Sequence, residues 1–348
     1  MEQEEQTALS TDIAISLGTS KTRIYIQGHG IVLSEPSVVS VDLETERIIA
    51  VGRRAYEMVG RTSNRIKVIF PLEGGVISDF YLVEGMLDYF LKRVSSSKIV
   101  MPRAVACVPG EITDVEKRAV VNTISMVGIR KVCLIEKPVA AALGAGIDLE
   151  SPTGQMIVNT GGGTSDIAVL SLNGAAASRS IKIGGNKMDE QIIKYVRKKY
   201  NMLIGKRMAE DAKIAIGCVY PKEKEEFYRL KGRDSITGMP KWIDFSSKEM
   251  MEAIIDSANQ IVREIENVLE EAPPELAGDV YNNGITFTGG TAKLYGFDRL
   301  IAKKTELEVR VAEDPENCIV LGAGIATKYM NELDKKEYGV LNPLTAEY

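Results

Sequence analysis

The sequence has almost no histidine: His29, in the triplet GHG, is the single one among 348 residues. We therefore exclude His-based metal and nucleophile sites and interpret His29 as a turn residue. Cysteine is scarce too, and its four positions follow no paired spacing: Cys107, Cys133, Cys218 and Cys318. This pattern predicts reduced core residues of a cytosolic protein and argues against a disulfide framework or a zinc site.

Long apolar runs and an excess of positive charge are also missing. No apolar run approaches the ~18 residues that a membrane span needs, and the acidic start MEQEEQTALS has no apolar core of a signal peptide. The net charge of -5 argues against a nucleic-acid-binding surface. A chain of 348 residues is too long for one ordinary core, so we expect at least two domains. Together with the cysteine pattern and the net charge, these absences indicate a cytoplasmic protein with no nucleic-acid partner.

Glycine, in contrast, is concentrated in short turns after apolar strands. The stretch IVNTGGGTSDIAV, residues 157–169, places three glycines between two apolar runs. Glycine costs conformational entropy, so three in a row indicate a turn or a close approach by another group. Main-chain amides cradle a phosphate only where no Cβ intervenes. The stretch is interpreted either as a phosphate-binding turn or as a tight hairpin that binds nothing.

A second copy of this pattern lies near the start of the chain, in DIAISLGTSKTRIYI, residues 12–26. Ser16 and Asn159 hold matching places before the two turns, as an internal duplication predicts. Strands follow both turns, whereas a Rossmann fingerprint or a Walker loop would lead into a helix, so those classes are disfavoured. A third turn, in GITFTGGTAKL at 284–294, follows a strand and leads into a helix. The three turns together predict a nucleotide held between two lobes.

Three segments have the periodicity of helices. Residues 113–128 begin with Thr113 and Glu116 in capping-box spacing, residues 187–200 repeat apolar side chains at helical spacing, and the long segment 246–276 stops at Pro273 and Pro274. Their apolar stripes predict core faces. Strands and helices alternate, so the fold class is α/β. The charged, turn-rich segment 221–245 predicts an exposed hairpin or insertion.

Nearly the whole chain resembles the MreB-type bacterial actins of the actin, Hsp70 and sugar-kinase superfamily. The resemblance rests on segments found in the same order: GIVLSEPSVVSV, GVISDF, ITDVEKRAV, EKPVAAALGAG, MDEQIIKYVRKKYNMLIG, PPEL and VLGAGIAT. It implies an actin-like fold of two duplicated lobes around a nucleotide cleft, with domain I at 1–150 plus about 321–348 and domain II at 151–320. It also implies ATP or ADP as ligand, with Mg²⁺ a further candidate, and polymerisation into filaments.

The same resemblance implies the site residues. The first glycine turn is a phosphate loop made of Gly18, Thr19, Ser20 and Lys21, and the second is made of Gly161, Gly162, Gly163 and Thr164. Ribose and adenine contacts are expected from the segment Glu210 to Lys213. The third glycine turn adds contacts from Gly289, Gly290, Thr291 and Ala292.

Several positions depart from the family pattern at the hydrolysis machinery. The family carries aspartates at the places of Ser16 and Asn159, and these organise Mg²⁺, which needs oxygen ligands of negative charge. Asn159 keeps only an oxygen, for a weak contact to Mg²⁺ through water. Lys21 replaces an asparagine and is expected to reach the phosphates. Lys137 stands at the catalytic glutamate and has no lone pair to accept a proton from water. Thr164, the second water-positioning residue, is retained.

These departures predict a filament protein with weak or absent ATP hydrolysis, although neutral drift compensated nearby is the alternative. A hydrolytically active MreB scaffold for cell-wall synthesis is the competing function. A sugar kinase would need a carboxylate base that no motif offers, and an Hsp70-type chaperone would need a peptide-binding domain. Departures of this kind suggest an organism with several MreB paralogues as partners, such as a wall-less bacterium with helicity-based motility.

Membrane contact is a separate expectation. The hydrophobic loop of the family falls at KIVMP, residues 98–102, where Ile99, Val100 and Met101 are candidates for contact with the bilayer. The acidic N-terminus would be repelled by anionic lipid. A bland surface turn at 98–102 is an equally good interpretation. The expected location is therefore the cytoplasm and its cytoskeleton, with membrane association left open.

Overall fold

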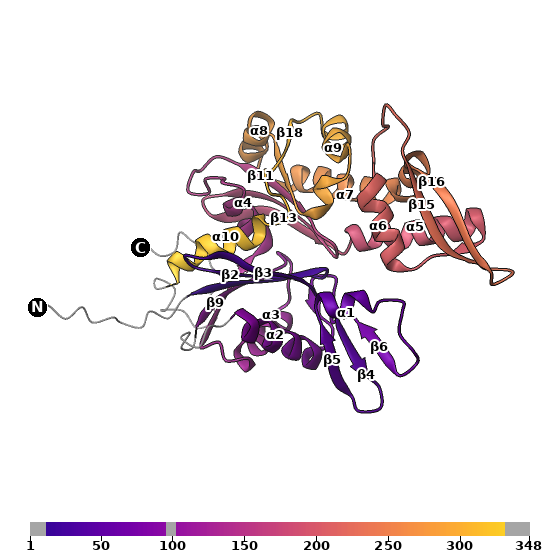
Figure 1. Cartoon of the computed structure of the whole chain (residues 1–348). Helices are drawn as coiled ribbons and strands as arrows, with labels where there is room; N and C mark the ends of the chain where they lie inside the picture. The colour runs from indigo at the N-terminus through magenta and orange to yellow at the C-terminus, as the bar shows by residue number, and fades with distance from the viewer. Residues whose placement is uncertain (1–11, 95–101, 331–348) are drawn as a thin grey trace, which may run out of the picture.

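The computed structural model describes residues 12–94 and 102–330, and it contains two five-stranded mixed sheets (Figure 1). The first sheet has the order β10-β9-β1-β2-β3. Its strands are β1 (Ile13–Leu17), β2 (Lys21–Ile26), β3 (Gly30–Pro36), β9 (Arg103–Val108) and β10 (Lys131–Glu136). The second sheet has the order β13-β12-β11-β17-β18. Its strands are β11 (Gln155–Thr160), β12 (Ser165–Ser171), β13 (Gly174–Ile181), β17 (Ile285–Thr288) and β18 (Val309–Val311).

The two sheets have the same topology. In each, the first strand forms an antiparallel hairpin with the second and pairs in parallel with a strand that returns much later in the chain. Ser16 is the penultimate residue of β1 and Asn159 the penultimate residue of β11. The predicted duplication is therefore confirmed, and the glycine turns are the β1–β2 and β11–β12 hairpins.

Helices cover both sheets, and Figure 1 shows α10 lying between the two lobes. The first lobe carries α1 (Arg53–Glu57), α2 (Phe80–Val94) and α3 (Asp114–Met126), and α4 (Lys137–Gly144) packs between the two sheets. The second carries α5 (Gly185–Tyr200), α6 (Lys206–Ile216), α7 (Ser247–Glu271), α8 (Pro274–Asn283) and α9 (Phe297–Thr305). The chain then forms α10 (Cys318–Ala326) and a short 3₁₀ turn, η2 (Thr327–Tyr329).

The three predicted helices are confirmed as α3, α5 and α7. Helix α3 begins after Thr113, whose hydroxyl accepts from the Glu116 amide while the Glu116 side chain accepts from the Thr113 amide. Helix α7 ends at Glu271, just before the two prolines. The third glycine turn leads into a 3₁₀ turn, η1 (Gly290–Lys293), and not directly into an α-helix.

Smaller sheets extend the outer edges of both lobes. In the first lobe these are β4 (Val39–Asp42), β5 (Arg47–Val51) and β6 (Ile66–Ile69), with the short hairpin β7 (Leu72–Glu73) and β8 (Val76–Ile77). In the second lobe β14 (Met202–Leu203) pairs with the hairpin β15 (Phe227–Asp234) and β16 (Pro240–Ser246). The predicted exposed hairpin at 221–245 is therefore confirmed.

A buried layer of small side chains joins the two lobes. It consists of α4, α10 and the facing sides of both sheets, with Ala140 and Ala323 fully buried in it. A Cβ on Gly144 would lie 1.8 Å from the Cys318 carbonyl oxygen, so the two helices cross with their backbones nearly in contact. The close crossing seats the N-terminus of α4, and with it Lys137, at the centre of the molecule.

Other sequence expectations have mixed outcomes. All four cysteines are buried, and none of them forms a disulfide among the described residues, as predicted. Within residues 12–94 and 102–330, no helix is long and apolar enough to cross a membrane. Ile99, Val100 and Met101 lie outside the described residues, and membrane contact through them stays a prediction.

Candidate functional site

The three glycine turns meet at one cavity of about 360 Å³. Every residue predicted for the site lines it except Ala292, which is buried in the core of the second lobe. The lining residues that were predicted are Gly18, Thr19, Ser20, Lys21, Lys137, Asn159, Gly161, Gly162, Gly163, Thr164, Glu210, Lys213, Gly289, Gly290 and Thr291. They come from both lobes, so the cavity is an interlobe cleft.

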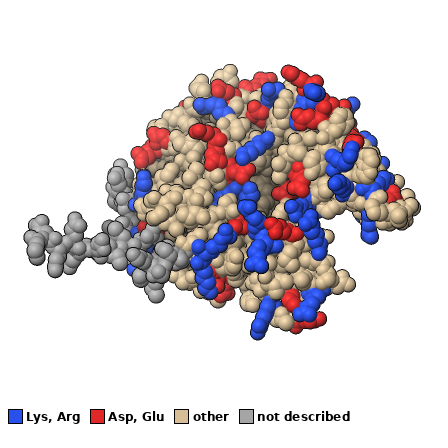
Figure 2. All heavy atoms as spheres, viewed as in Figure 1, with Lys and Arg blue, Asp and Glu red and all other residues tan. Residues whose placement is uncertain are grey.

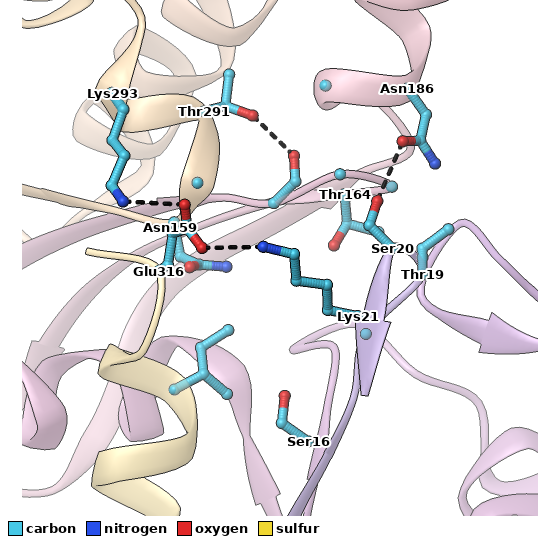
Figure 3. Close-up of a pocket in the computed structure, with 18 of the residues that line it drawn as sticks. Ser16, Thr19, Ser20, Lys21, Asn159, Thr164, Asn186, Thr291, Lys293 and Glu316 are labelled. Carbon is cyan, nitrogen blue, oxygen red and sulfur yellow. Dashed lines mark hydrogen bonds and ion pairs between the residues drawn. The ribbon is translucent and has the colours of Figure 1, made fainter. Parts of the chain in front are cut away.

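The first and second glycine turns touch one another across this cleft. A Cβ on Gly162 would lie 1.9 Å from Ser20 Oγ, and a Cβ on Gly163 would lie 2.2 Å from Thr19 Oγ1. Ser20 Oγ also donates a hydrogen bond to Asn186 Oδ1, at 3.1 Å, at the start of α5 (Figure 3). The bare backbone of the second turn is therefore required by the opposite turn, whatever ligand binds.

Local hydrogen bonds fix the shape of the second and third turns. The Gly161 amide donates to the Thr164 carbonyl at 2.9 Å, and Thr291 Oγ1 donates to the Gly161 carbonyl at 2.9 Å. Gly289 has φ of 89° and a Cβ there would lie 2.2 Å from the Thr160 carbonyl oxygen. Only glycine combines that left-handed conformation with such a close approach.

Lys137 lies at the inner end of the cavity. It is the first residue of α4, it is 4% exposed, and Pro138 follows it. A Cβ on Gly75, in the turn between β7 and β8, would lie 3.1 Å from Lys137 Nζ and 3.0 Å from Thr164 Cγ2. Lys137, Thr164 and the β7–β8 turn therefore surround one point. Glu136, the neighbouring carboxylate, does not line the cavity.

The Thr164 hydroxyl is oriented by a buried carboxylate. The hydroxyl donates to Asp166 Oδ2 at 3.0 Å, which leaves its lone pairs as acceptors toward the cavity. Asp166 is fully buried and its other oxygen accepts from Ser180 Oγ at 2.6 Å. This carboxylate therefore orients Thr164 and is not a lining residue of the cavity.

The side chains at this end do not fit a bound Mg²⁺ ion. Ser16 and Asn159 are neutral, and Asn159 Oδ1 already accepts a hydrogen bond from Thr288 Oγ1 at 3.3 Å. Among the described residues there is no group of three histidine, cysteine or acidic side chains that could hold a metal ion. Mg²⁺ prefers several oxygen ligands with negative charge, and a lysine ammonium occupies the same end of the cavity.

Four charged side chains that line the cavity form a cross-lobe cluster, and the sequence did not predict it. Lys21 Nζ, on β2, lies 3.3 Å from Glu316 Oε2, and Lys293 Nζ lies 2.9 Å from Glu316 Oε1 (Figure 3). Arg23 Nη2, also on β2, lies 3.3 Å from Glu316 Oε2. Burial alone would raise the pKa of Glu316, but the hydrogen bond from Lys293 and the charge of Lys21 lower it. Lys21, expected at the phosphates, is thus paired with a carboxylate 295 residues away.

Glu210 and Lys213, on α6, are both held by neighbours that the sequence did not identify. The Tyr56 hydroxyl of α1 donates to Glu210, which connects the outer parts of the two lobes. Lys213 Nζ lies 2.7 Å from Asp189 Oδ1 and donates to the Gly185 carbonyl at 2.8 Å. The pKa of Asp189 is raised to about 6, because its burial outweighs the opposing charge of Lys213.

Comparison with known proteins gives one consistent relationship. The model of the MreB/Mbl protein family matches residues 10–335. The cell shape-determining protein Mbl of Bacillus cereus is 43% identical over 326 residues, which are 93% of this chain and 98% of that protein. The MamK double helical filament, 20% identical with a TM-score of 0.77 over 91% of this chain and 98% of that one, shares the fold.

MreB5 of Spiroplasma citri is similar in structure as well as in sequence. Its crystal structure bound to AMPPNP has a TM-score of 0.90 and is 35% identical, covering 93% of this chain and 98% of that one. Its structure bound to ADP has the same TM-score at 34% identity, covering 95% of this chain and all of that one. The actin-like fold expected from the sequence is thereby confirmed.

Proposed function

The chain belongs to the MreB/Mbl protein family, and on this premise we propose that it binds ATP or ADP in the interlobe cavity and polymerises into filaments. The observation that carries the proposal is the convergence of three glycine turns from both lobes on one cavity. Turns of this kind bind phosphates through main-chain amides. The AMPPNP and ADP held by the similar MreB5 structures support an adenine nucleotide as ligand.

We propose further that hydrolysis is weak or absent. Thr164 can accept a hydrogen bond from a water molecule, but Lys137 cannot accept a proton from it, because an ammonium has no lone pair. The adjacent carboxylate of Glu136 does not line the cavity and so cannot replace the missing base. Loss of a positioned general base typically slows a reaction by about 10²–10⁴-fold.

The cellular role follows from the family. We propose a cytoskeletal protein that acts in cell shape, or in the helicity-based motility of a wall-less bacterium, by assembly with itself or with other MreB paralogues. The name of the similar Mbl protein supports the role in cell shape. The division into domain I (1–150 and about 321–348) and domain II (151–320) is part of the proposal, supported by the packing of α10 against α4.

Two measurements on the purified chain test the proposal. Electron microscopy with and without ATP should show filaments, and a single-turnover assay at saturating ATP should show slow release of phosphate. Lys137→Glu should recover part of the hydrolysis rate if Lys137 only replaces the catalytic base, and should lower activity and weaken binding if its ammonium contacts the γ-phosphate. Lys137→Glu combined with Asn159→Asp should recover more than either change alone, since residues that act as one unit are not additive.

The competing function makes the opposite prediction for the unmodified chain. A hydrolytically active scaffold for wall synthesis would release phosphate rapidly without any substitution, and that result would refute weak hydrolysis. A chain that binds no nucleotide and forms no filaments under any condition would refute the whole proposal.

A further inference from the structure

The cavity is positively charged although the whole chain has a net charge of -5. Five cationic side chains line it and only two carboxylates do, Glu210 and Glu316. The cations are Lys21, Arg23, Lys137, Lys213 and Lys293. In Figure 2, Lys and Arg side chains also gather along the middle of the molecule, on the face that is shown. The cleft is therefore built for a strongly anionic ligand.

Four of the five cations already have a carboxylate partner. Lys21, Arg23 and Lys293 share Glu316, and Lys213 pairs with Asp189. Lys137 differs from them. Within residues 12–94 and 102–330, no carboxylate lies within ion-pairing distance of its ammonium, and no group accepts a hydrogen bond from it. It is also 4% exposed. A charge in so buried a place is costly without a partner, so a ligand that brings negative charge would stabilise this ammonium.

The surroundings of Lys137 locate that charge at the phosphate end. Its ammonium faces the same point as Thr164 and the Gly75 turn, and that turn is tied to the first glycine turn by a hydrogen bond of 3.0 Å from the Gly75 amide to Thr19 Oγ1. Cys107, which pairs with Ser16 across β9 and β1, also lies within electrostatic reach of Lys137. Burial raises the pKa of the Cys107 thiol to about 12, although the positive charge of Lys137 opposes this. Ser16 and Cys107 are therefore both neutral, and neither offers an anion.

Three departures from the family pattern change the charge of the site in the same direction. Where the family resemblance expects two aspartates that organise Mg²⁺, this chain has the neutral Ser16 and Asn159. Where it expects a glutamate, the chain has the positive Lys137. All three changes make the site more positive, and they do so without a metal ion. A cation fixed to the protein can neutralise phosphate oxygens in the way that a bound metal does.

We propose, on the basis of the function proposed above, that the Lys137 ammonium binds the terminal phosphates and takes the place of Mg²⁺, so that this chain holds a nucleoside triphosphate without a divalent metal. The ammonium lies beside Thr164, at the end of the second glycine turn. The third phosphate of a triphosphate reaches it there, and a diphosphate lacks this group. Lys137 is therefore also a specificity residue that favours ATP over ADP.

The test measures nucleotide affinity with and without the metal. AMPPNP and ADP are titrated into the full chain by calorimetry, once with Mg²⁺ and once with EDTA. AMPPNP affinity should be the same in both buffers to within about threefold. Lys137→Met should lose AMPPNP affinity by roughly 10-fold to 100-fold in EDTA, the value of a hydrogen bond to a charged group, and should lose less for ADP. Lys137→Arg should retain most of the binding.

A matched control removes a lysine outside the cavity. The Lys222 side chain is 12% exposed and pairs with Glu226, so Lys222→Met removes a largely shielded charge outside the cavity and should leave both affinities unchanged. Circular dichroism checks that each variant is folded. The unmodified chain in EDTA decides the question even if Lys137→Met does not fold.

The outcomes separate this inference from the proposed function. If EDTA weakens AMPPNP binding to the unmodified chain by more than about tenfold, or if Lys137→Met binds AMPPNP in EDTA as the unmodified chain does, the role of Lys137 is refuted while nucleotide binding stands. If neither nucleotide binds in either buffer, both are refuted.

Discussion

Asp189 offers a test of whether burial or ion pairing determines the pKa of a carboxyl group beside the cavity. Its side chain is 9% exposed on α5, and its Oδ1 atom lies 2.7 Å from Lys213 Nζ. Burial raises its pKa to about 6 from the ordinary value of 3.8, and the charge of Lys213 offsets this only in part. Asp189→Asn replaces the carboxyl by a group of the same size that does not titrate.

The sign and size of the effect of pH on the free energy of unfolding follow from the difference in the Asp189 pKa between the folded and unfolded chains. Between about pH 4 and pH 6 the folded chain binds the Asp189 proton more tightly than the unfolded chain does. The stability from this group is therefore fully present below pH 3.8 and is lost as the pH rises through about 6. A shift of about two units at ~1.4 kcal/mol each corresponds to roughly 3 kcal/mol.

The assay is urea-induced unfolding of the unmodified chain and Asp189→Asn at several pH values from about 4 to 7.5. The free energy of unfolding of the unmodified chain, minus that of the variant, should fall by up to about 3 kcal/mol across this range and level off above pH 7. Asp234→Asn is the control: backbone hydrogen bonds from Thr237 and Ile236 lower the pKa of Asp234 to about 2, so its difference should be flat. A difference for Asp189→Asn that rises with pH would show that the ion pair with Lys213 dominates and would refute the reasoning.

Two further predictions concern the glycine turns and a helix cap. Gly162→Val should abolish ATP binding, because its Cβ would lie 1.9 Å from Ser20 Oγ and force the first and second turns apart; normal binding in a calorimetric titration would mean that these turns do not hold phosphate. Thr113→Ala should lower the free energy of unfolding by about 1 kcal/mol in urea titrations, because it removes the hydroxyl that accepts from the Glu116 amide and donates to Glu116 Oε2, while the backbone amide of residue 113 remains. Thr113→Ser should restore the cap, and an alanine variant as stable as the unmodified chain would contradict this account.

Structural features that depend on residues close together in the sequence could be predicted. The α3 cap depends on Thr113 and Glu116, three residues apart, and the end of α7 depends on the prolines that follow it. The duplicated hairpins were recognisable because both carry the same order of strand, small polar residue and glycine turn. In each case the physical cause acts over a few residues, so the order of residues was sufficient.

Charges that meet only after folding could not be predicted. Glu316 pairs with Lys21 across 295 residues, and the Tyr56 hydroxyl reaches Glu210 from the other lobe. Neither pair leaves a pattern in the sequence. The prediction for Ala292 had a different weakness: the third glycine turn is at the cavity, but within its 3₁₀ turn Thr291 bonds to Gly161 while Ala292 is buried in the core. A turn was predictable, whereas the direction of each side chain in it was not.

The glycines of the second turn have two physical reasons, and the sequence indicated only one of them. From sequence, bare backbone at Gly162 and Gly163 indicates a phosphate, because main-chain amides must approach it. The structure adds a second requirement: Ser20 and Thr19 of the opposite lobe occupy the space where Cβ atoms would be. A ligand on one turn is therefore in reach of both lobes. Lys137 and Thr164 both lie near the Gly75 turn, so a terminal phosphate bound there as proposed above would contact residues beside the place where the two glycine turns meet.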